Sequence, residues 1–276
     1  MVRFTLFPEH DMPLNELRIA LLSYMLARKM NRKCIVRVAD IDKANRGAGK
    51  GEALCDLLTH FGLRYDYAYY QSENIKYHLQ LASTLLDTKK AFICFCPDTQ
   101  RDFYDGPCES LSPQEVLNNP NPFVIRLKKP EDRFIILSQE KYPTHTFACA
   151  CDDMLQGVSA IIDEEKNLLE MPRQAFIQHS LGYEEEIVCT PVAPLVPFSE
   201  EMPRVKTLLD EGFLPEAIVN YLLLVSNPTP TDIFSLEEAM VWFDIKNIAT
   251  TPVYFDKEKL HSINQAYIQK PTSRRP

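Results

Sequence analysis

The sequence lacks several features that mark whole classes of protein. No apolar run in its 276 residues reaches the roughly 18 residues that a membrane-spanning helix needs, so we expect no membrane segment. The amino-terminal residues lack the basic and long apolar segments of a secretory signal, and eight cysteines are too few for a disulfide scaffold. We therefore expect a cytoplasmic protein whose cysteines are thiols or metal ligands.

Glycine and positive charge are also scarce. Only eight glycines occur, where about 7% of residues is ordinary, and the first of them is Gly47. The net charge of −8 predicts that the surface as a whole repels nucleic acid, so DNA binding is not expected and RNA binding needs a local basic patch. The rest of the composition, 45% hydrophobic and 25% charged, is that of an ordinary globular protein.

Hydrophobic residues alternate between the strand and helix periods over the first third of the chain. The pattern predicts strands at 2–7, 34–38 and 64–69, and helices at 14–30, 51–61 and 75–86. This alternation is typical of an α/β fold with a parallel sheet and right-handed crossovers.

Residues 91–148 break this rhythm and have the character of an insertion, with short strands predicted at 123–127 and 133–137. Beyond them, strands are predicted at 146–151, 158–162 and 187–195, a helix at 173–181, and four more helices at 201–209, 215–225, 235–242 and 256–268. Cys149 and Cys151 lie two apart on a predicted strand, so we expect them to face the same way as buried core thiols.

The densest group of metal-ligand residue types lies in the insertion. Cys94, Cys96, Tyr104 and Cys108 fall within one short segment, and three sulfurs with a phenol or a water molecule can complete a tetrahedral zinc site. The spacing is not the common Cys-x-x-Cys type, so incidental reduced cysteines at a strand end are the alternative. We favour a structural zinc ion.

Two other patterns give weaker indications of a functional site. Residues 46–51 fall short of a phosphate-binding loop, which would need a glycine at Ala44 and a hydroxyl at Gly51. Asp40 and Asp42 follow a predicted strand, where they form either a paired-carboxylate site or ion pairs with neighbouring cations.

Segments spread along nearly the whole chain form one consistent pattern. They are VRF at 2–4, RVADID at 37–42, YYQSE at 69–73, CFC at 94–96, YDGPC at 104–108, FVIRL at 123–127, DDMLQGV at 152–158, PRQ at 172–174, GFLPEAIVNYLL at 212–223 and FDKEKLHSIN at 255–264. Taken together and in this order, they resemble the glutamyl-tRNA synthetases, the class I aminoacyl-tRNA synthetases for glutamate.

The resemblance implies a class I synthetase fold: an α/β, Rossmann-like parallel sheet with an inserted α+β subdomain and a C-terminal helical segment. The two halves of the sheet are expected at 1–90 and 146–197, and an acceptor-end-binding insertion, which holds zinc in some members, at 91–145. Residues 198–276 correspond to the start of the stem-contact helices. The resemblance implies that the family's C-terminal anticodon-binding domain has no counterpart here, a pattern that also resembles the shorter glutamyl-queuosine tRNA synthetases, and the sequence leaves open whether that is natural.

The sequence departs from the family at the positions that bind ATP. The H-I-G-H motif, whose histidines stabilise the transferring phosphates and whose glycine admits the adenine, is Pro13-Leu14-Asn15-Glu16 here, and a nearby serine is Phe7. Proline donates no hydrogen bond, Asn15 fills space that adenine needs and Glu16 repels phosphate. The K-M-S-K-S-type loop, expected between residues 195 and 212, is replaced by a shorter segment with acidic residues.

The positions that bind glutamate in the family depart as well. Its ammonium-binding glutamate is Ala39, a pocket tyrosine is His145, and the arginine that meets the substrate carboxylate is Asp163, a full charge reversal. Four remnants of the substrate site are kept: Arg3, Arg18, Asp40 and Asp42.

Loss of both ATP motifs together with a reversed substrate-binding charge predicts that amino-acid activation is lost while the core is kept. The first hypothesis is therefore a pseudoenzyme that binds no ATP and has a protein partner or tRNA, bound weakly if it is tRNA. One alternative is an active ATP-dependent glutamate–tRNA ligase or glutamyl-queuosine-type enzyme with a remodelled site. Another is a redox- or zinc-sensing protein built on the three cysteines. The sequence leaves the partner and the oligomeric state open.

Overall fold

The computed structural model describes residues 1–8, 11–41, 50–96, 104, 106–197 and 201–269. The chain forms two compact units. Unit 1 comprises Met1–Tyr69, Ser159–Leu168 and Ile187–Pro276, and unit 2 comprises Tyr70–Val158 and Leu169–Glu186. The segment 146–197, expected to be one half of the sheet, is thus divided between the two units.

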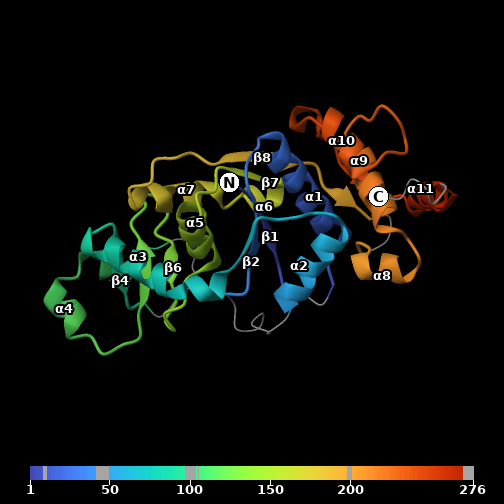
Figure 1. The fold of residues 1–276 in the computed structure, drawn as a ribbon. Coiled ribbons are helices and arrows are strands. Elements are labelled where there is room, and N and C mark those ends of the chain that lie inside the picture. The colour runs from blue at the N-terminus through green and yellow to red at the C-terminus, as the bar shows by residue number, and fades with distance from the viewer. Residues whose placement is uncertain (9–10, 42–49, 97–103, 105, 198–200, 270–276) are drawn as a thin grey trace. The chain divides into compact units, whose positions relative to one another are not determined.

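Unit 1 is built on a five-stranded sheet (Figure 1). Its strands are β1 (Val2–Leu6), β2 (Cys34–Val38), β3 (Tyr67–Tyr70), β7 (Ala160–Glu164) and β8 (Val188–Val192). They lie in the order β3-β2-β1-β7-β8, and β1 pairs in parallel with both β2 and β7, as β7 does with β8. Every residue of β2 is buried, as expected for the middle of a covered parallel sheet. The predicted α/β fold with a parallel sheet is confirmed.

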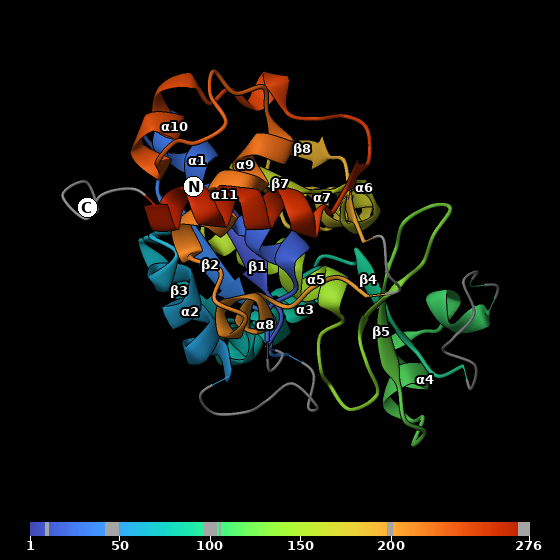
Figure 2. The same cartoon turned by 90° about the vertical axis from the view of Figure 1, so that its right-hand side faces the viewer.

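Helices cover this sheet and extend beyond it. They are α1 (Leu14–Lys29), α2 (Lys50–His60), α6 (Glu165–Leu168), α8 (Val205–Asp210), α9 (Pro215–Ser226), α10 (Leu236–Trp242) and α11 (Lys257–Gln269), with a 3-10 turn η4 at Ile245–Asn247. The short strands β9 (Leu195–Val196) and β10 (Val253–Tyr254) pair in parallel. α11 packs against α9 (Figure 2).

Unit 2 has its own antiparallel sheet in the order β4-β5-β6. Its elements are η2 (Gln71–Asn74), α3 (Ile75–Asp87), β4 (Ala91–Cys94), η3 (Pro107–Ser110), α4 (Pro113–Leu117), β5 (Val124–Leu127), β6 (Ile135–Leu137), α5 (His145–Leu155) and α7 (Met171–Ser180). One apolar core joins α3, the three strands, α5 and α7, with Leu85, Leu127, Phe147 and Ile177 almost completely buried. The unit therefore has the α+β character that was expected of the insertion.

The strand predicted at 146–151 is wrong, because these residues belong to helix α5. The Thr144 hydroxyl accepts a hydrogen bond of 3.4 Å from the Phe147 N–H and so caps the helix. All residues from Phe147 to Asp153 are buried, and a helix that is buried on every side shows no amphipathic period in its sequence. Cys149 and Cys151 therefore do not share a strand face, but both are buried thiols as predicted.

The strand predicted at 34–38 occurs with the same ends, and most other predicted elements occur with shifted ends. The helix predicted at 201–209 starts at Val205, because Pro203 lies just before it and disfavours helical backbone at the preceding residue. The strand predicted at 64–69 starts at Tyr67, after a turn in which Gly62 has a positive φ of 76°. Among the helices that the structure describes, none is long and apolar enough to cross a membrane.

Candidate functional site

The start of α1 carries the tetrad that replaces the expected nucleotide motif. Pro13 is the residue before the helix and gives it no side-chain cap. Backbone hydrogen bonds join this stretch to the segment before α8: the Leu14 N–H donates to the Pro203 carbonyl at 2.9 Å, and the Val205 N–H donates to the Met12 carbonyl at 2.8 Å. The start of α1 and the segment before α8, the two regions in which the resemblance predicts the ATP motifs, therefore bind each other directly.

Carboxylates gather around the first turn of α1. The Glu164 side chain is almost completely buried, and one of its oxygens lies 2.7 Å from Lys166 Nζ. The other oxygen accepts a weak bond of 3.5 Å from Asn15 Nδ2. Glu16 adds a further acid to the first turn, where negative charge stabilises the helix. These charges complement the helix itself and repel a phosphate group.

Arg18, expected to be a remnant of the substrate site, points into the core of unit 1. It is 1% exposed, its Nε donates to Ser226 Oγ at 2.7 Å, and its Nη1 donates to the Ala193 carbonyl at 2.6 Å. Burial lowers the Arg18 pKa to about 10, while the charge of Glu164 opposes that shift. The side chain holds helices α1 and α9 and the stretch after β8 together.

Arg3 and Asp163 lie close enough to influence each other. Arg3 is buried and donates from Nη1 to Thr5 Oγ1 at 2.9 Å. The pKa of Asp163 is raised by burial, and the nearby Arg3 partly offsets that rise. Asp163 Oδ1 also accepts bonds from the Glu164 N–H at 2.8 Å and from Asn167 Nδ2 at 2.7 Å, at the start of α6. Asp163 therefore interacts electrostatically with Arg3, one of the two basic residues that the resemblance keeps.

The remaining substrate-type positions are spread over both units. In unit 1, Phe7 is exposed just after β1, Ala39 is buried just after β2, and Asp40 is half-buried beside it. Asp42 lies outside the described residues. In unit 2, His145 is exposed at the start of α5, with its Nε2 3.5 Å from Cys149 Sγ.

The three cysteines of the predicted metal site come together in unit 2. Cys94 ends β4, Cys108 lies in η3, and the sulfurs of Cys94, Cys96 and Cys108 are all within 4.8 Å of one another. Cys96 Sγ and Cys108 Sγ are 3.6 Å apart. Tetrahedral zinc with Zn–S bonds of about 2.3 Å places its sulfurs about 3.8 Å apart, so the cluster fits that ion.

The surroundings of the cluster shift the pKa values of Cys96 and Cys108 in opposite directions. Burial and hydrogen bonds to Cys108 and Cys94 raise the Cys96 pKa to about 12. Burial also acts to raise the Cys108 pKa, but hydrogen bonds from the Phe95 N–H and from Cys96 and Tyr104 outweigh it, so the net pKa is lowered.

Tyr104 and Gly106 shape the same cluster. The Tyr104 hydroxyl accepts a hydrogen bond of 2.8 Å from the Cys108 N–H, and burial raises its pKa. A Cβ atom at Gly106 would lie 2.6 Å from Cys96 Sγ, closer than real contacts allow. A side chain at this position is therefore excluded by the sulfur.

The sequence prediction missed a buried polar network in unit 2. Asp152 is fully buried and is bound by His78 Nε2 at 2.8 Å, Gln71 Nε2 at 3.0 Å and Asn74 Nδ2 at 3.0 Å. This network ties η2 and α3 to α5, so it is part of the scaffold of the unit. The polar residues of the segments YYQSEN and DDM can be read from the sequence, but only the fold shows that their side chains contact one another.

Comparisons with known proteins agree with this picture of the fold. The family described as tRNA synthetases class I (E and Q), catalytic domain, matches residues 2–133. Glutamate–tRNA ligase 1 of Campylobacter fetus is 38% identical over 315 aligned positions, which cover 100% of this chain and 73% of the relative. Glutamate–tRNA ligase 1 of Nitratiruptor sp. is 37% identical, with 98% of this chain and 72% of the relative covered.

Solved structures give the same result for the fold. A glutamate tRNA ligase from Elizabethkingia meningosepticum, in complex with its amino acid, superposes with a TM-score of 0.86 and 20% identity, covering 98% of this chain and 70% of that one. Glutamate-tRNA synthetase from Elizabethkingia anophelis gives a TM-score of 0.83 and 22% identity with the same coverage.

Proposed function

The chain belongs to the glutamate–tRNA ligase family of class I aminoacyl-tRNA synthetases, and we propose that it has lost amino-acid activation and acts as a binding or regulatory protein linked to tRNA or to translation. Its relatives are named for ligating glutamate to tRNA, and the proposal concerns how this chain differs from them.

The observation that carries the proposal is that the two basic residues of the site, Arg18 and Arg3, already interact with other groups of this chain. Arg18 is buried, and its Nε and Nη1 bond to Ser226 and Ala193, so these two nitrogens are held by the core of unit 1. Arg3 interacts with Asp163, which stands where the family's pattern has an arginine. Activation of an amino acid requires cations or hydrogen-bond donors aimed at the developing charge on the phosphates. Near the start of α1 the structure has the acids Glu16 and Glu164, and the neighbouring Arg204 donates from Nη1 to the Asp11 carbonyl at 2.8 Å.

The pairing of residues 12–14 with residues 203–205 supports the same proposal. A nucleotide bound between these stretches would have to break backbone hydrogen bonds that the chain makes with itself. A buried backbone group left without a partner costs about 1–3 kcal/mol. Breaking this pairing therefore adds to the electrostatic cost of binding ATP.

An active ligase with a remodelled site is the second candidate, favoured by the 38% identity over the full chain. ATP–pyrophosphate exchange, measured with tRNA and all twenty amino acids, separates the two. We expect no exchange above the enzyme-free background, with Campylobacter jejuni glutamate–tRNA ligase 1 assayed in parallel as the active reference. Measurable exchange would remove the proposal. Titration calorimetry should likewise show no ATP binding tighter than millimolar.

We also propose that Cys94, Cys96 and Cys108 hold a structural zinc ion, with Tyr104 or water in the fourth position. The proposal is supported by the mutual distances of the sulfurs and by the lowered pKa of Cys108. The ion would tie the end of β4 to η3 across the segment between them. A redox- or zinc-sensing role would show as stoichiometric zinc release by mild peroxide, coupled to a change in partner binding.

For tRNA we expect weak and salt-sensitive binding, because the net charge of −8 opposes a polyanion. Filter binding at 50 and 200 mM salt measures this. Tight binding of one tRNA that does not weaken with salt would contradict the expectation.

A further inference from the structure

A group of exposed cations surrounds the C-terminal end of α1. This basic surface consists of Arg28, Lys29, Lys33 and Arg64, all exposed in a chain whose net charge is −8. Arg28 Nη2 donates to the Arg64 carbonyl at 2.7 Å, Lys29 Nζ to the Val241 carbonyl at 3.1 Å, and Lys33 Nζ to the Tyr67 hydroxyl at 2.9 Å. Within the described part of the chain, none of the four makes an ion pair with a carboxylate.

Two carboxylates of neighbouring segments accept hydrogen bonds from backbone groups, and the charge of Asp66 also acts on Lys33. Asp66 Oδ2 accepts from the Cys34 N–H at 2.8 Å, and Asp244 Oδ1 accepts from the Lys246 N–H at 3.0 Å. Two cations in the last turn complement the helix dipole, which is an ordinary role. Lys33 and Arg64 lie outside the helix, so that role does not account for them.

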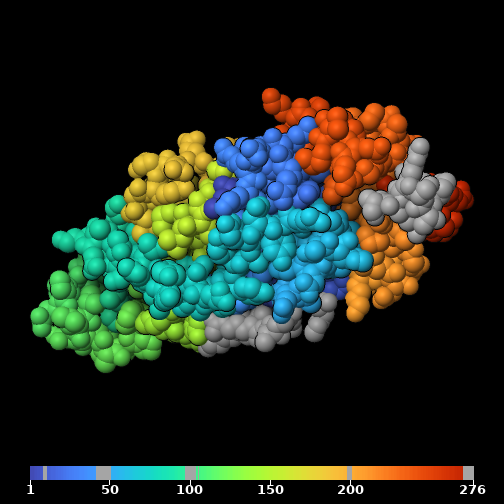
Figure 3. Space-filling model, viewed as in Figure 1, coloured from blue at the N-terminus to red at the C-terminus, as the bar shows by residue number. Residues whose placement is uncertain are grey.

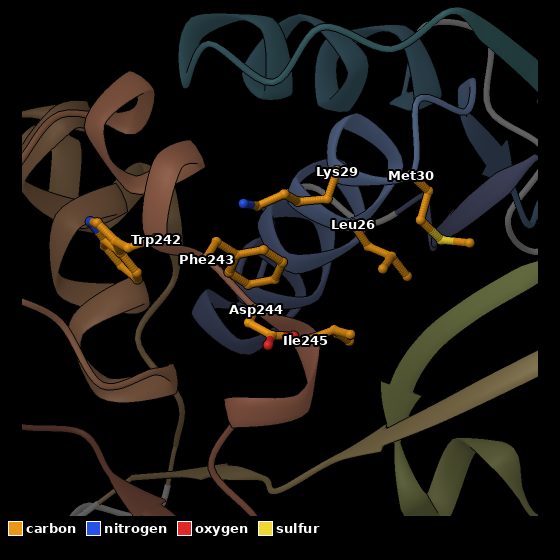
Figure 4. A pocket seen from close by; sticks show the side chains of 7 residues that line it. All are labelled: Leu26, Lys29, Met30, Trp242, Phe243, Asp244 and Ile245. Carbon is orange, nitrogen blue, oxygen red and sulfur yellow. The ribbon is translucent and has the colours of Figure 1, made fainter.

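An apolar pocket adjoins the basic surface. It has a volume of about 370 Å³ and is lined by Leu26, Lys29, Met30, Trp242, Phe243, Asp244 and Ile245 (Figure 4). Lys29 belongs to both features: it lines the pocket and bonds the chain just before Trp242. In the space-filling view, the blue surface of α1 borders the orange surface of α10 (Figure 3).

The basic surface lies at the opposite end of β2 from Ala39 and Asp40, two of the substrate-type positions. Lys33 directly precedes β2, and its carbonyl accepts a hydrogen bond of 2.9 Å from the Val2 N–H at the start of β1. Ala39 and Asp40 follow the other end of β2. Occupying one of these regions of unit 1 therefore need not involve the other.

We propose that the basic surface and its pocket bind an acidic segment of a protein partner, with one apolar side chain of that segment in the pocket. A buried apolar anchor with a charged rim is how protein interfaces concentrate their binding energy. The inference goes beyond the function proposed above, because it holds whether or not the chain activates amino acids.

Stacking surfaces for RNA bases are poor in the same region. Single-stranded RNA is bound by stacking its bases on exposed aromatic faces. Here the Lys33 Nζ lies over the Tyr67 ring at 4.7 Å, and the Arg28 guanidinium lies over the Tyr24 ring at 5.0 Å. These cations cover ring faces that bases would need, whereas the pocket suits an aliphatic or aromatic side chain.

Trp242, the only tryptophan of the chain, gives a direct readout because it lines the pocket. The probe is a 12-residue peptide of Asp and Glu with one central Leu and no aromatic residue. We expect a saturable change in Trp242 emission that weakens as salt is added. Replacing the central Leu by Ala should raise the Kd about tenfold, the effect of losing one well-buried side chain.

Charge-reversal variants distinguish binding at the basic surface from nonspecific electrostatic attraction of the peptide. Lys29→Glu and, away from the pocket, Arg64→Glu should each raise the Kd about tenfold or more, while Lys259→Glu on the exposed side of α11 should leave it within about twofold. Thermal melts confirm that each variant is folded. The proposal is overturned if the peptide leaves Trp242 emission unchanged. It is also overturned if Lys259→Glu weakens binding as much as the other two, or if a 12-nucleotide single-stranded RNA binds more tightly than the peptide.

Discussion

Two places of this chain correspond to ligand sites of the family, the cysteine cluster of unit 2 and the first turn of α1 in unit 1. They differ in how many of the expected ligand-binding residues are present. At the cluster, three sulfurs lie within 4.8 Å of one another, and Gly106 leaves room for one of them. At α1, the resemblance aligns proline, asparagine and glutamate with the family's histidines and glycine, and Arg18 of this helix is bonded to Ser226 and Ala193 in the core.

The difference indicates which constraint has kept each site. A structural metal site contributes directly to folding, so its loss lowers the stability of the whole unit. Residues that only bind a nucleotide add nothing to the unliganded fold, and their replacement by acids at a helix start even stabilises the helix. Under the proposed loss of activation, the fold and its cysteine cluster would therefore persist.

The largest effect is expected for Cys94→Ser. Wild-type protein should hold about one zinc ion per chain by mass spectrometry of metals, and the variant almost none. Unit 2 should then lose resistance to proteolysis, because structural zinc contributes on the order of 10 kcal/mol in small zinc domains. Cys189→Ser, in the half-buried strand β8 of unit 1, is the control. Equal loss of metal in both variants, or a wild-type protein without metal, would contradict the proposed zinc site.

Arg18→Ala tests whether the arginine in α1 has become structural. It removes a buried cation with two hydrogen bonds, so the free energy of unfolding should fall by about 3 kcal/mol. Arg28→Ala, at the exposed end of the same helix, should change it by less than about 0.5 kcal/mol. Guanidinium chloride titration measures both. A tolerated Arg18→Ala would mean that the side chain is free for a substrate.

Gly106→Ala tests the packing of the cluster. The added Cβ would lie 2.6 Å from Cys96 Sγ and 3.0 Å from the Tyr104 ring, so one ligand has to move. We expect zinc affinity about tenfold lower in competition with a chelating dye, a typical cost of disturbing the support of a metal site. Ser110→Ala, exposed at the end of η3, should bind zinc as the wild type does.

The smallest effect is expected for Asp163→Asn. Burial raises the folded-state pKa of Asp163 above its ordinary 3.8, so the folded protein holds this proton more tightly than the unfolded chain does. As pH rises from 3.8 through the raised pKa, the free energy of unfolding therefore falls. Asparagine does not titrate, so it removes this fall in the free energy of unfolding, and its side-chain oxygen still accepts the hydrogen bond from the Glu164 N–H. Chemical denaturation between pH 4 and 7 should show the variant more stable at the upper end, by less than about 1 kcal/mol. An unchanged pH profile would refute the assigned burial.

Most of the fold was predictable because its elements repeat local patterns. β2 was predicted residue for residue at Cys34–Val38, and α1 to within one residue at its C-terminal end. α5 was mistaken for a strand because its residues are buried on all sides, which removes the helical period from the sequence. The candidate site was only partly predictable: Cys94, Cys96 and Cys108 meet as expected, whereas Arg18 turned out to be a core residue.

The sequence by itself determined the class of the fold, the thiols of the cluster and the replacement of the nucleotide-binding residues, because each of these depends on residue identity and short-range order. Only the tertiary structure decided what the remaining charges do. Arg18 finds Ser226, Arg3 faces Asp163, and Lys29 adjoins Trp242 across long stretches of chain. Such contacts follow from how the helices and strands pack, and electrostatic energy depends on distance in space and on burial rather than on separation along the chain.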